Sequence, residues 1–243
     1  MNRQKTKILP IANLEDPRME AIANEAILKF LKECLPSLSE KTKVLDAGCG
    51  GGLLSQLLKQ KFKMEIIGVD LADEALKLAR KRGVQARKAD LEKRLPFKNN
   101  TFDLIIFCQV IEHLFNPDQA LQEIYRVLKK GGSLIVTTPN LAAWFNRGLL
   151  LLGSQPFFME TSTLDKTVGL SWSRRLTVNR QPIGHLRIFT LGALKGILGL
   201  HHFNFQLAAA YSTPYFPWYA RLVDRIFCLS PSWGSELVLW VKK

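Results

Sequence analysis

The residues best suited to chemistry are glycines and acids near the ends of short apolar runs. Asp46, Gly48, Gly50 and Gly52 stand at alternate positions, and Asp70 closes the next apolar run. Glycine permits a positive φ angle and lets a ligand approach the backbone closely. A carboxylate can accept several hydrogen bonds. The pattern predicts a strand, a glycine turn and a helix, with a ligand on the turn. The alternative is an ordinary turn, with Asp70 capping the following helix.

Two common phosphate-binding motifs do not fit this turn. The dinucleotide fingerprint G-x-G-x-x-G needs a third glycine at the position of Leu53. A P-loop needs Lys followed by Ser or Thr at the helix start, where Leu53 and Leu54 stand. The turn is therefore not expected to hold a pyrophosphate or a nucleoside triphosphate.

The remaining pattern, Asp-x-Gly-x-Gly-x-Gly with an acid ending the second strand, resembles the class I S-adenosylmethionine-dependent methyltransferases. It is similar to the ubiquinone- and menaquinone-biosynthesis-like members, well over residues 40–140 and weakly over 184–243. The resemblance implies S-adenosylmethionine as the cofactor, with its ribose hydroxyls on Asp70 and its adenine beside Asp90 and Leu91. A carboxylate suits such donors, although Asp90 could also be a solvated loop residue. The implied cofactor-binding residues are Asp46, Gly48, Gly50, Asp70, Leu71, Asp90, Leu91 and Gln109.

A second segment, Gln109-Val-Ile-Glu-His-Leu-Phe-Asn-Pro117, matches the family segment that lines the other side of the cofactor. Family members that methylate exocyclic amino groups of nucleic acid bases usually carry Asp/Asn-Pro-Pro-aromatic there. The residues from Gln109 to Glu112 cannot supply that clamp, which disfavours nucleic acid as a partner.

Two histidines are the candidates for a catalytic base. Methyl transfer from a sulfonium mainly requires alignment of the acceptor, with a base where the acceptor carries a proton. His113, and His185 in Gly184-His-Leu-Arg-Ile-Phe-Thr190, lie in segments that the resemblance places near the cofactor, and imidazole titrates near neutral pH. The alternative for His113 is a packing or cofactor-shielding role. His201 and His202 are expected at the surface or at a strand edge.

These residues must be positioned by alternating strands and helices. Apolar runs and helical periodicity predict an α/β, Rossmann-like, doubly wound and mostly parallel sheet. By resemblance it has seven strands in the order 3-2-1-4-5-7-6, the last antiparallel, with an inserted lid. Strands are expected near 44–47, 64–70, 84–88, 104–108, 133–138, 203–210 and 235–242, and helices at 17–34, from 53, at 72–82, 117–129, 191–199 and 218–227.

Composition limits the class of protein and its surroundings. The length of 243 residues and the apolar fraction of 47% suit one domain, 1–243, with an N-terminal helix at 16–35 after a loose basic leader. The four cysteines form no C-x-x-C, so neither a metal site nor a disulfide framework is predicted. No apolar run reaches the roughly 18 residues of a membrane span. A cytoplasmic protein, peripheral to a membrane if attached at all, is expected.

The distal part of the chain, residues 141–243, has a different composition. It holds 16 of the 23 aromatic residues, and 11 Lys and Arg against 4 Asp and Glu. Residues 141–183 interrupt the alternation and are expected to form a lid. In the helix at 218–227, Trp218, Leu222 and Ile226 share one face. The opposite side holds Arg221, Asp224 and Arg225. This helix either packs on the core or lies at a membrane surface.

Together the observations favour a methyltransferase that acts on a small, apolar or lipid-like acceptor. The net charge of +13 suits an anionic acceptor or an anionic membrane surface, and it also suits a basic surface with no partner. Two alternatives stay open. One is an RNA-directed methyltransferase, and the other is an S-adenosylmethionine-binding protein without catalysis.

Overall fold

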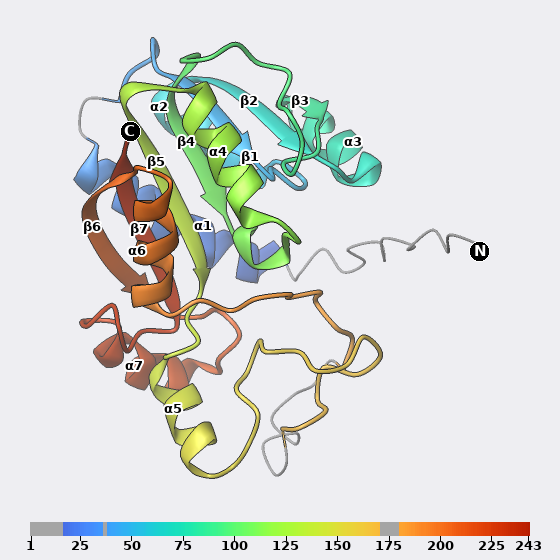
Figure 1. Cartoon of the computed structure of the whole chain (residues 1–243), viewed down its shortest axis with the longest axis vertical. Helices are drawn as coiled ribbons and strands as arrows, with labels where there is room; N and C mark the ends of the chain where they lie inside the picture. Colours follow the sequence, from blue (N-terminus) through green and yellow to red (C-terminus); the bar gives the residue numbers. More distant parts are fainter. Residues whose placement is uncertain (1–16, 36–37, 171–179) are drawn as a thin grey trace.

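A seven-stranded sheet forms the centre of the protein (Figure 1). The structure is a computed structural model that describes residues 17–35, 38–170 and 180–243. The strand order is β3-β2-β1-β4-β5-β7-β6, and β7 pairs antiparallel with both of its neighbours. The predicted fold class and strand order are therefore confirmed. The strands are β1 (Lys43–Ala47), β2 (Glu65–Asp70), β3 (Gln85–Lys88), β4 (Phe102–Cys108), β5 (Leu128–Pro139), β6 (Asn204–Tyr211) and β7 (Glu236–Lys242).

Helices cover both faces of this sheet. In Figure 1, α4 and α6 lie in front of the sheet, and α1 and α2 lie behind it. The helices are α1 (Pro17–Cys34), α2 (Leu53–Phe62), α3 (Asp73–Lys81), α4 (Pro117–Val127), α5 (Trp144–Leu151), α6 (Leu191–Leu200) and α7 (Trp218–Phe227), with a 3-10 turn η1 (Ile111–His113). The bounds of α1 agree with the helix predicted at the N-terminal end. The leader before it lies outside the described residues.

The two covered faces explain why the central strands are continuous apolar runs. Successive strand residues point to opposite faces of a sheet. Leu45 therefore joins the core that includes α4 and α6, whereas its neighbour Val44 joins the core that includes α1 and α2. A strand buried on both faces needs an apolar side chain at every position. This arrangement holds the carboxyl ends of β1, β2 and β4 at one edge.

The boundary between α4 and β5 differs from the prediction. The helix begins as expected, because Asn116 accepts a hydrogen bond from the Gln119 N–H (3.0 Å) and Pro117 stands at the first position. However, α4 ends at Val127 and β5 begins at Leu128, rather than near residue 133. Lys243 explains the difference, since its Nζ donates to the Leu128 carbonyl (2.8 Å) and its backbone pairs with Gly131 and Gly132. A contact distant in sequence therefore fixes this boundary.

The helix predicted at 218–227 is present as α7, but it does not pack its apolar stripe on the core. Trp218, Leu222 and Ile226 are 70%, 52% and 67% exposed, whereas Asp224 is fully buried. The core-packing interpretation of that stripe is therefore wrong. In Figure 1, α5 and α7 lie together beyond the arrowhead of β5.

The rest of the predicted insertion is mostly irregular chain after α5. Residues 171–179, which include Arg174 and Arg175, lie outside the described residues. A lid role for 141–183 stays a prediction. Within the part of the chain that is described, no helix combines the length and apolar character needed to cross a bilayer.

Candidate functional site

The glycine turn after β1 has the backbone that the sequence predicts. Gly48, Gly50 and Gly52 have φ angles of 84°, 50° and 76°. Residues that carry a Cβ atom seldom adopt these positive φ angles. A Cβ on Gly48 would collide with the side chain of Val110, whereas a Cβ on Gly50 would meet no atom within 4 Å. The turn therefore presents bare backbone next to open space at Gly50.

Asp70 is tied to this turn by its carboxylate. Its Oδ2 accepts a hydrogen bond from the Gly50 N–H (2.8 Å), and its Oδ1 accepts one from the Ala72 N–H (2.9 Å). Both interpretations from the sequence have a basis here, because Ala72 precedes α3 while Gly50 belongs to the glycine turn. A carboxylate offers about four acceptor sites, so two remain for hydroxyl donors. Two free acceptor sites match the two hydroxyl donors of the ribose in S-adenosylmethionine.

Asp46 lies under the turn and is buried. Its Oδ2 accepts a hydrogen bond from the Ser55 hydroxyl (2.6 Å), which joins β1 to α2. Burial raises the pKa of Asp46 to about 6, the Ser55 hydrogen bond opposes that shift, and nearby Asp70 adds to it. The burial and the Ser55 bond indicate that Asp46 shapes the turn from below.

Asp90 and Leu91 come next along the same edge. The Ala89 N–H donates to the Asp70 carbonyl (3.1 Å), so the loop after β3 begins beside the end of β2. Asp90 accepts from the Glu92 N–H (3.0 Å) and pairs with Lys93 (3.1 Å). Leu91 is buried in the core, whereas Leu71 is exposed. The structure thus leaves Asp90 half-buried at the edge and packs Leu91 inward.

Gln109 follows β4 in an unusual backbone conformation, and its side chain contacts β5, β6 and β7. Its φ angle is 55°, which is uncommon for a residue with a Cβ and is typical of positions that the surrounding structure holds under strain. Its Nε2 lies 3.3 Å from both Thr137 Oγ1 and Glu236 Oε2, and 3.4 Å from the Tyr211 hydroxyl. The predicted cofactor residues therefore do not all face one point, because Gln109 turns to β5, β6 and β7.

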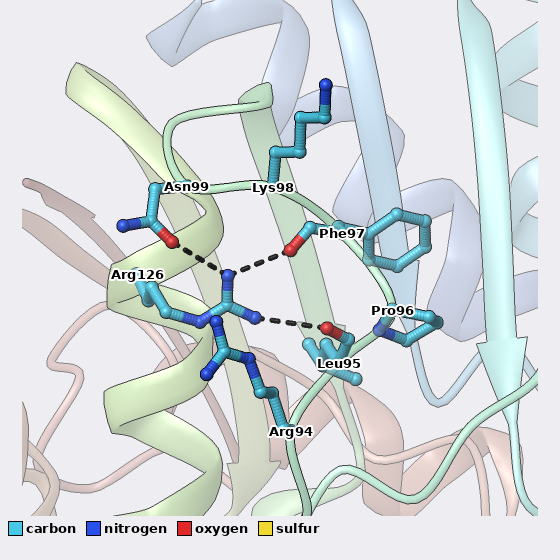
Figure 2. Close-up of a pocket in the computed structure, with 7 residues that line it drawn as sticks. All are labelled: Arg94, Leu95, Pro96, Phe97, Lys98, Asn99 and Arg126. Carbon is cyan, nitrogen blue, oxygen red and sulfur yellow. Dashed lines mark hydrogen bonds between the residues drawn. The ribbon is translucent and has the colours of Figure 1, made fainter.

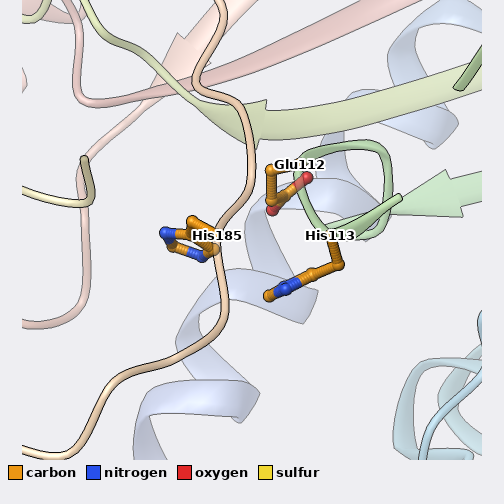
Figure 3. A group of neighbouring side chains, drawn as sticks. All are labelled: Glu112, His113 and His185. Carbon is orange, nitrogen blue, oxygen red and sulfur yellow. The ribbon is translucent and has the colours of Figure 1, made fainter. Parts of the chain in front are cut away.

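Glu112, His113 and His185 form a second cluster (Figure 3). One ligand-type atom of each side chain lies within 4.8 Å of the others, and the two imidazole rings are 4.9 Å apart. Nδ1 of His113 is 3.1 Å from the Gly184 carbonyl, and Nδ1 of His185 is 3.0 Å from the Phe158 carbonyl. A carbonyl only accepts, so each Nδ1 carries the proton. Such carbonyl-held imidazoles resemble the usual setting of metal-binding histidines.

Burial controls the charges in this cluster. Burial lowers the pKa of His185 to about 4, and nearby His113 adds to the shift, so the imidazole is neutral at pH 7. Burial likewise raises the pKa of Glu112 to about 8. Thr138 donates to Glu112 Oε2 (3.0 Å), while the buried Oε1 has no hydrogen-bond partner among the described residues. The neutral His185 ring can therefore accept a hydrogen bond from an acceptor molecule, and a deprotonated Glu112 would complete a set of cation ligands.

Several residues that the sequence did not single out hold this cluster together. Glu160 accepts hydrogen bonds from the N–H groups of Ile183, Gly184 and His185. Arg187 donates to the carbonyls of Leu114 and Phe115 (2.9 Å for the latter), across 72 residues of chain. Glu160 is one of only four acids in the distal part of the sequence, and this scarcity was the feature that could have singled it out.

The prediction that His201 lies at the surface or at a strand edge was wrong. It is buried, and its Nε2 lies 2.8 Å from Asp118 Oδ1, which joins α6 to α4, whereas His202 is exposed.

A hollow of about 550 Å³ lies beside the loop before β4 and is lined by none of the residues described above (Figure 2). Its Arg126 donates to the carbonyls of Phe97 (2.8 Å) and Leu95 (3.1 Å) and to Asn99 Oδ1 (2.9 Å). It also pairs with Glu123 (2.6 Å). Arg126 therefore fixes the loop, and its hydrogen-bonding capacity is used within the protein.

Comparison with known proteins agrees with this fold and identifies a methyltransferase domain. Residues 45–136 match the family model described as a methyltransferase domain. The mitochondrial ubiquinone biosynthesis O-methyltransferase of Rattus norvegicus is 30% identical over 146 residues, which cover 56% of this chain and 42% of that protein. The ubiquinone biosynthesis O-methyltransferase of Nitrosomonas europaea is 32% identical over 123 residues, covering 48% and 52%. The chain thus spans about half the length of these curated relatives.

A solved structure extends the likeness of fold over nearly the whole chain. A Thermotoga maritima S-adenosylmethionine-dependent methyltransferase, described as a possible histamine N-methyltransferase, superposes with a TM-score of 0.61 and 21% identity. The match covers 93% of this chain and 91% of that one. At this identity the likeness concerns the fold.

Proposed function

We propose that this chain, which contains the domain of the class I S-adenosylmethionine-dependent methyltransferases, binds S-adenosylmethionine and methylates a small, apolar or lipid-like acceptor. The observation that carries the proposal is the tie between Asp70 and Gly50. It holds a carboxylate with spare acceptor capacity beside bare backbone, at the edge where ligands of such sheets bind.

The chain's own residues would divide the binding of the cofactor as follows. Gly48 and Gly50 would lie under its methionine part, Asp70 would accept hydrogen bonds from the ribose hydroxyls, and Asp90 would accept one from the adenine amino group. When bound, the cofactor supplies an electrophilic methyl group on a sulfonium.

The Glu112, His113 and His185 cluster is proposed as the wall that faces the acceptor. His185 is neutral at pH 7, so it can accept a hydrogen bond from an acceptor hydroxyl and orient its oxygen. The aromatic ring of Phe158, 6.0 Å from the His185 ring, adds an apolar surface beside it. The curated relatives are O-methyltransferases of ubiquinone biosynthesis, which supports a hydroxyl on an apolar molecule as the methylated group.

A lipid-like acceptor resides in a membrane, so we also propose peripheral association with an anionic membrane surface. The proposed lid at 141–183 would then cover the acceptor.

Calorimetric titration with S-adenosylmethionine tests the cofactor assignment. Asp70→Ala should weaken binding by about 2 to 3 kcal/mol, roughly 30- to 150-fold in Kd, because hydrogen bonds to a carboxylate are lost. Glu74→Ala is the matched control, since Glu74 is an exposed acid on the neighbouring helix and pairs only with Lys77 among the described contacts. Unchanged affinity in Asp70→Ala would exclude the ribose assignment, and no binding to the unaltered chain would refute the proposed function.

Transfer of a labelled methyl group tests the acceptor class. The chain is incubated with labelled cofactor and either a lipid extract or total RNA. Label is expected in the organic-soluble fraction. Label in RNA would favour an RNA-directed enzyme, and cofactor binding without transfer to either fraction would favour a binding protein without catalysis.

A further inference from the structure

Exposed apolar side chains gather at the end of the molecule formed by α5 and α7. We define the α5–α7 face by the exposed apolar residues Leu150, Leu151, Leu152, Trp218, Tyr219, Leu222, Val223, Ile226 and Leu229. Leu151 and Leu229 are 88% and 86% exposed. Scattered exposed apolar residues are ordinary, but a contiguous apolar patch marks an interaction surface.

Asp224 is the reason that α7 turns this stripe outward. Its Oδ1 accepts hydrogen bonds from Trp144 Nε1 (2.9 Å) and the Ser235 hydroxyl (2.6 Å), and its Oδ2 accepts one from the Thr213 N–H (3.1 Å). Rotating α7 to bury the stripe would carry Asp224 into solvent and leave its three donors without their acceptor, which is costly. The exposure is therefore imposed by the fold.

Aromatic packing fixes α5 beside α7. The rings of Trp144 and Phe227 stack at 4.9 Å with an interplanar angle of 12°. The Arg147 guanidinium lies 4.2 Å from the centre of the Trp233 ring. The apolar residues at the end of α5 are thus held at the same end of the molecule as the α7 stripe.

The charges around this face select the occupant. Helical geometry places Arg221, which is half-buried, and Arg225, which is exposed, along one side of the stripe. The single acid of α7, Asp224, is buried. No acid occurs in α5. A second copy would bring like charges together, whereas the headgroups of anionic lipids would complement them. Trp218 and Tyr219 are the residue types that favour a membrane interface.

We propose that the α5–α7 face lies on an anionic lipid bilayer, with the apolar stripe among the acyl chains and the arginines at the headgroups. The inference rests on the proposed function for its meaning, because the same bilayer would supply the lipid-like acceptor. The face lies beyond the arrowhead of β5 (Figure 1), the end of the sheet where β4 passes into Gln109 and His113.

Sedimentation of the full chain with lipid vesicles tests this surface. Vesicles of phosphatidylcholine alone are compared with vesicles that also contain phosphatidylglycerol. The bound fraction should rise with phosphatidylglycerol and fall as salt screens the arginines. Trp218→Ser combined with Ile226→Ser should lower the partition coefficient about tenfold or more, because two exposed apolar side chains lose their insertion. Leu200→Ser, an equally exposed leucine position on α6, should leave it unchanged.

Other outcomes overturn the proposal. No sedimentation with anionic vesicles at low salt would do so, as would an equal loss in Leu200→Ser. Self-association in analytical ultracentrifugation that the Trp218 and Ile226 changes abolish, without vesicle binding, would assign the face to a second copy. Calorimetry on the same samples separates this result from the function, because all variants should retain the affinity for S-adenosylmethionine.

Discussion

Two amphipathic helices of this protein, α4 and α7, place their apolar stripes in opposite surroundings, in the core for α4 and in solvent for α7. In α4, Leu121 and Ile124 are fully buried under the sheet, as an amphipathic pattern predicts. In α7 the apolar residues are exposed and the acid is buried. The difference lies in the partners that each region offers. Trp144, Thr213 and Ser235 each donate a hydrogen bond to Asp224 of α7, so hydrogen bonding sets the orientation of this helix.

The largest effect is expected from removing the buried acid of α7. Asp224→Ala should lower the free energy of unfolding by about 3 kcal/mol or more, because three donors, two of them buried, lose their acceptor. Urea denaturation measures the change. Arg225→Ala, at the exposed neighbouring position, should stay within about 0.5 kcal/mol. Equal values for the two variants would show that Asp224 does not hold α7.

The glycine turn after β1, which lies before the distal part of the chain, should be nearly as sensitive to substitution. Gly48→Val should lower the free energy of unfolding by about 2 to 3 kcal/mol and abolish cofactor binding, because its φ angle and Val110 both oppose a side chain. Gly50→Ala should cost only about 1 kcal/mol, since its side chain meets open space. Combining Gly48→Ala with Val110→Ala should recover part of the loss relative to Gly48→Ala alone. Without such recovery, the steric argument fails.

An intermediate effect is expected from pH at the contact between His113 and His185, which belongs to the distal part of the chain, residues 141–243. The folded pKa of His185, about 4, lies below its ordinary value, so its stabilisation is present above about pH 6.5 and is lost as the pH falls toward 4. At pH 5 the loss is on the order of 2 kcal/mol. His185→Gln should flatten the fall in unfolding free energy between pH 6.5 and 4, measured by urea denaturation. His202→Gln, at an exposed histidine, should leave it unchanged.

The smallest effect sharpens the comparison of the helices most directly. Leu222→Ser in α7 should change the free energy of unfolding by less than about 0.5 kcal/mol, because this side chain is already in water. Leu121→Ala in α4 should cost about 2 to 5 kcal/mol, because it empties a buried position. Thermal or urea unfolding of both variants suffices. A large loss for Leu222→Ser would mean that the stripe is covered in solution.

The sequence predicted the features that depend on local pattern. Apolar runs, glycine turns and helix caps located the strands, the Asp70 edge and the start of α4. The resemblance supplied the strand order. Features that depend on distant pairing were not predictable in the same way. The meeting of His113 with His185 needs Arg187 to reach the carbonyls after η1, and the early end of α4 needs Lys243. The orientation of α7 needed Thr213, Trp144 and Ser235 to be placed first.

The carboxylate of Glu160 has a consequence for how the chain can vary. By binding the N–H groups of residues 183–185, it closes the ends of the intervening segment, 161–182, against each other. Within the described part of this segment, the Gly169 carbonyl accepts a hydrogen bond from the Gln155 N–H (2.8 Å) and the Leu170 carbonyl accepts one from the Ser154 hydroxyl (2.8 Å). The chain can therefore vary little at Glu160, because a side chain that cannot accept these three hydrogen bonds would release His185 and both ends of the segment together.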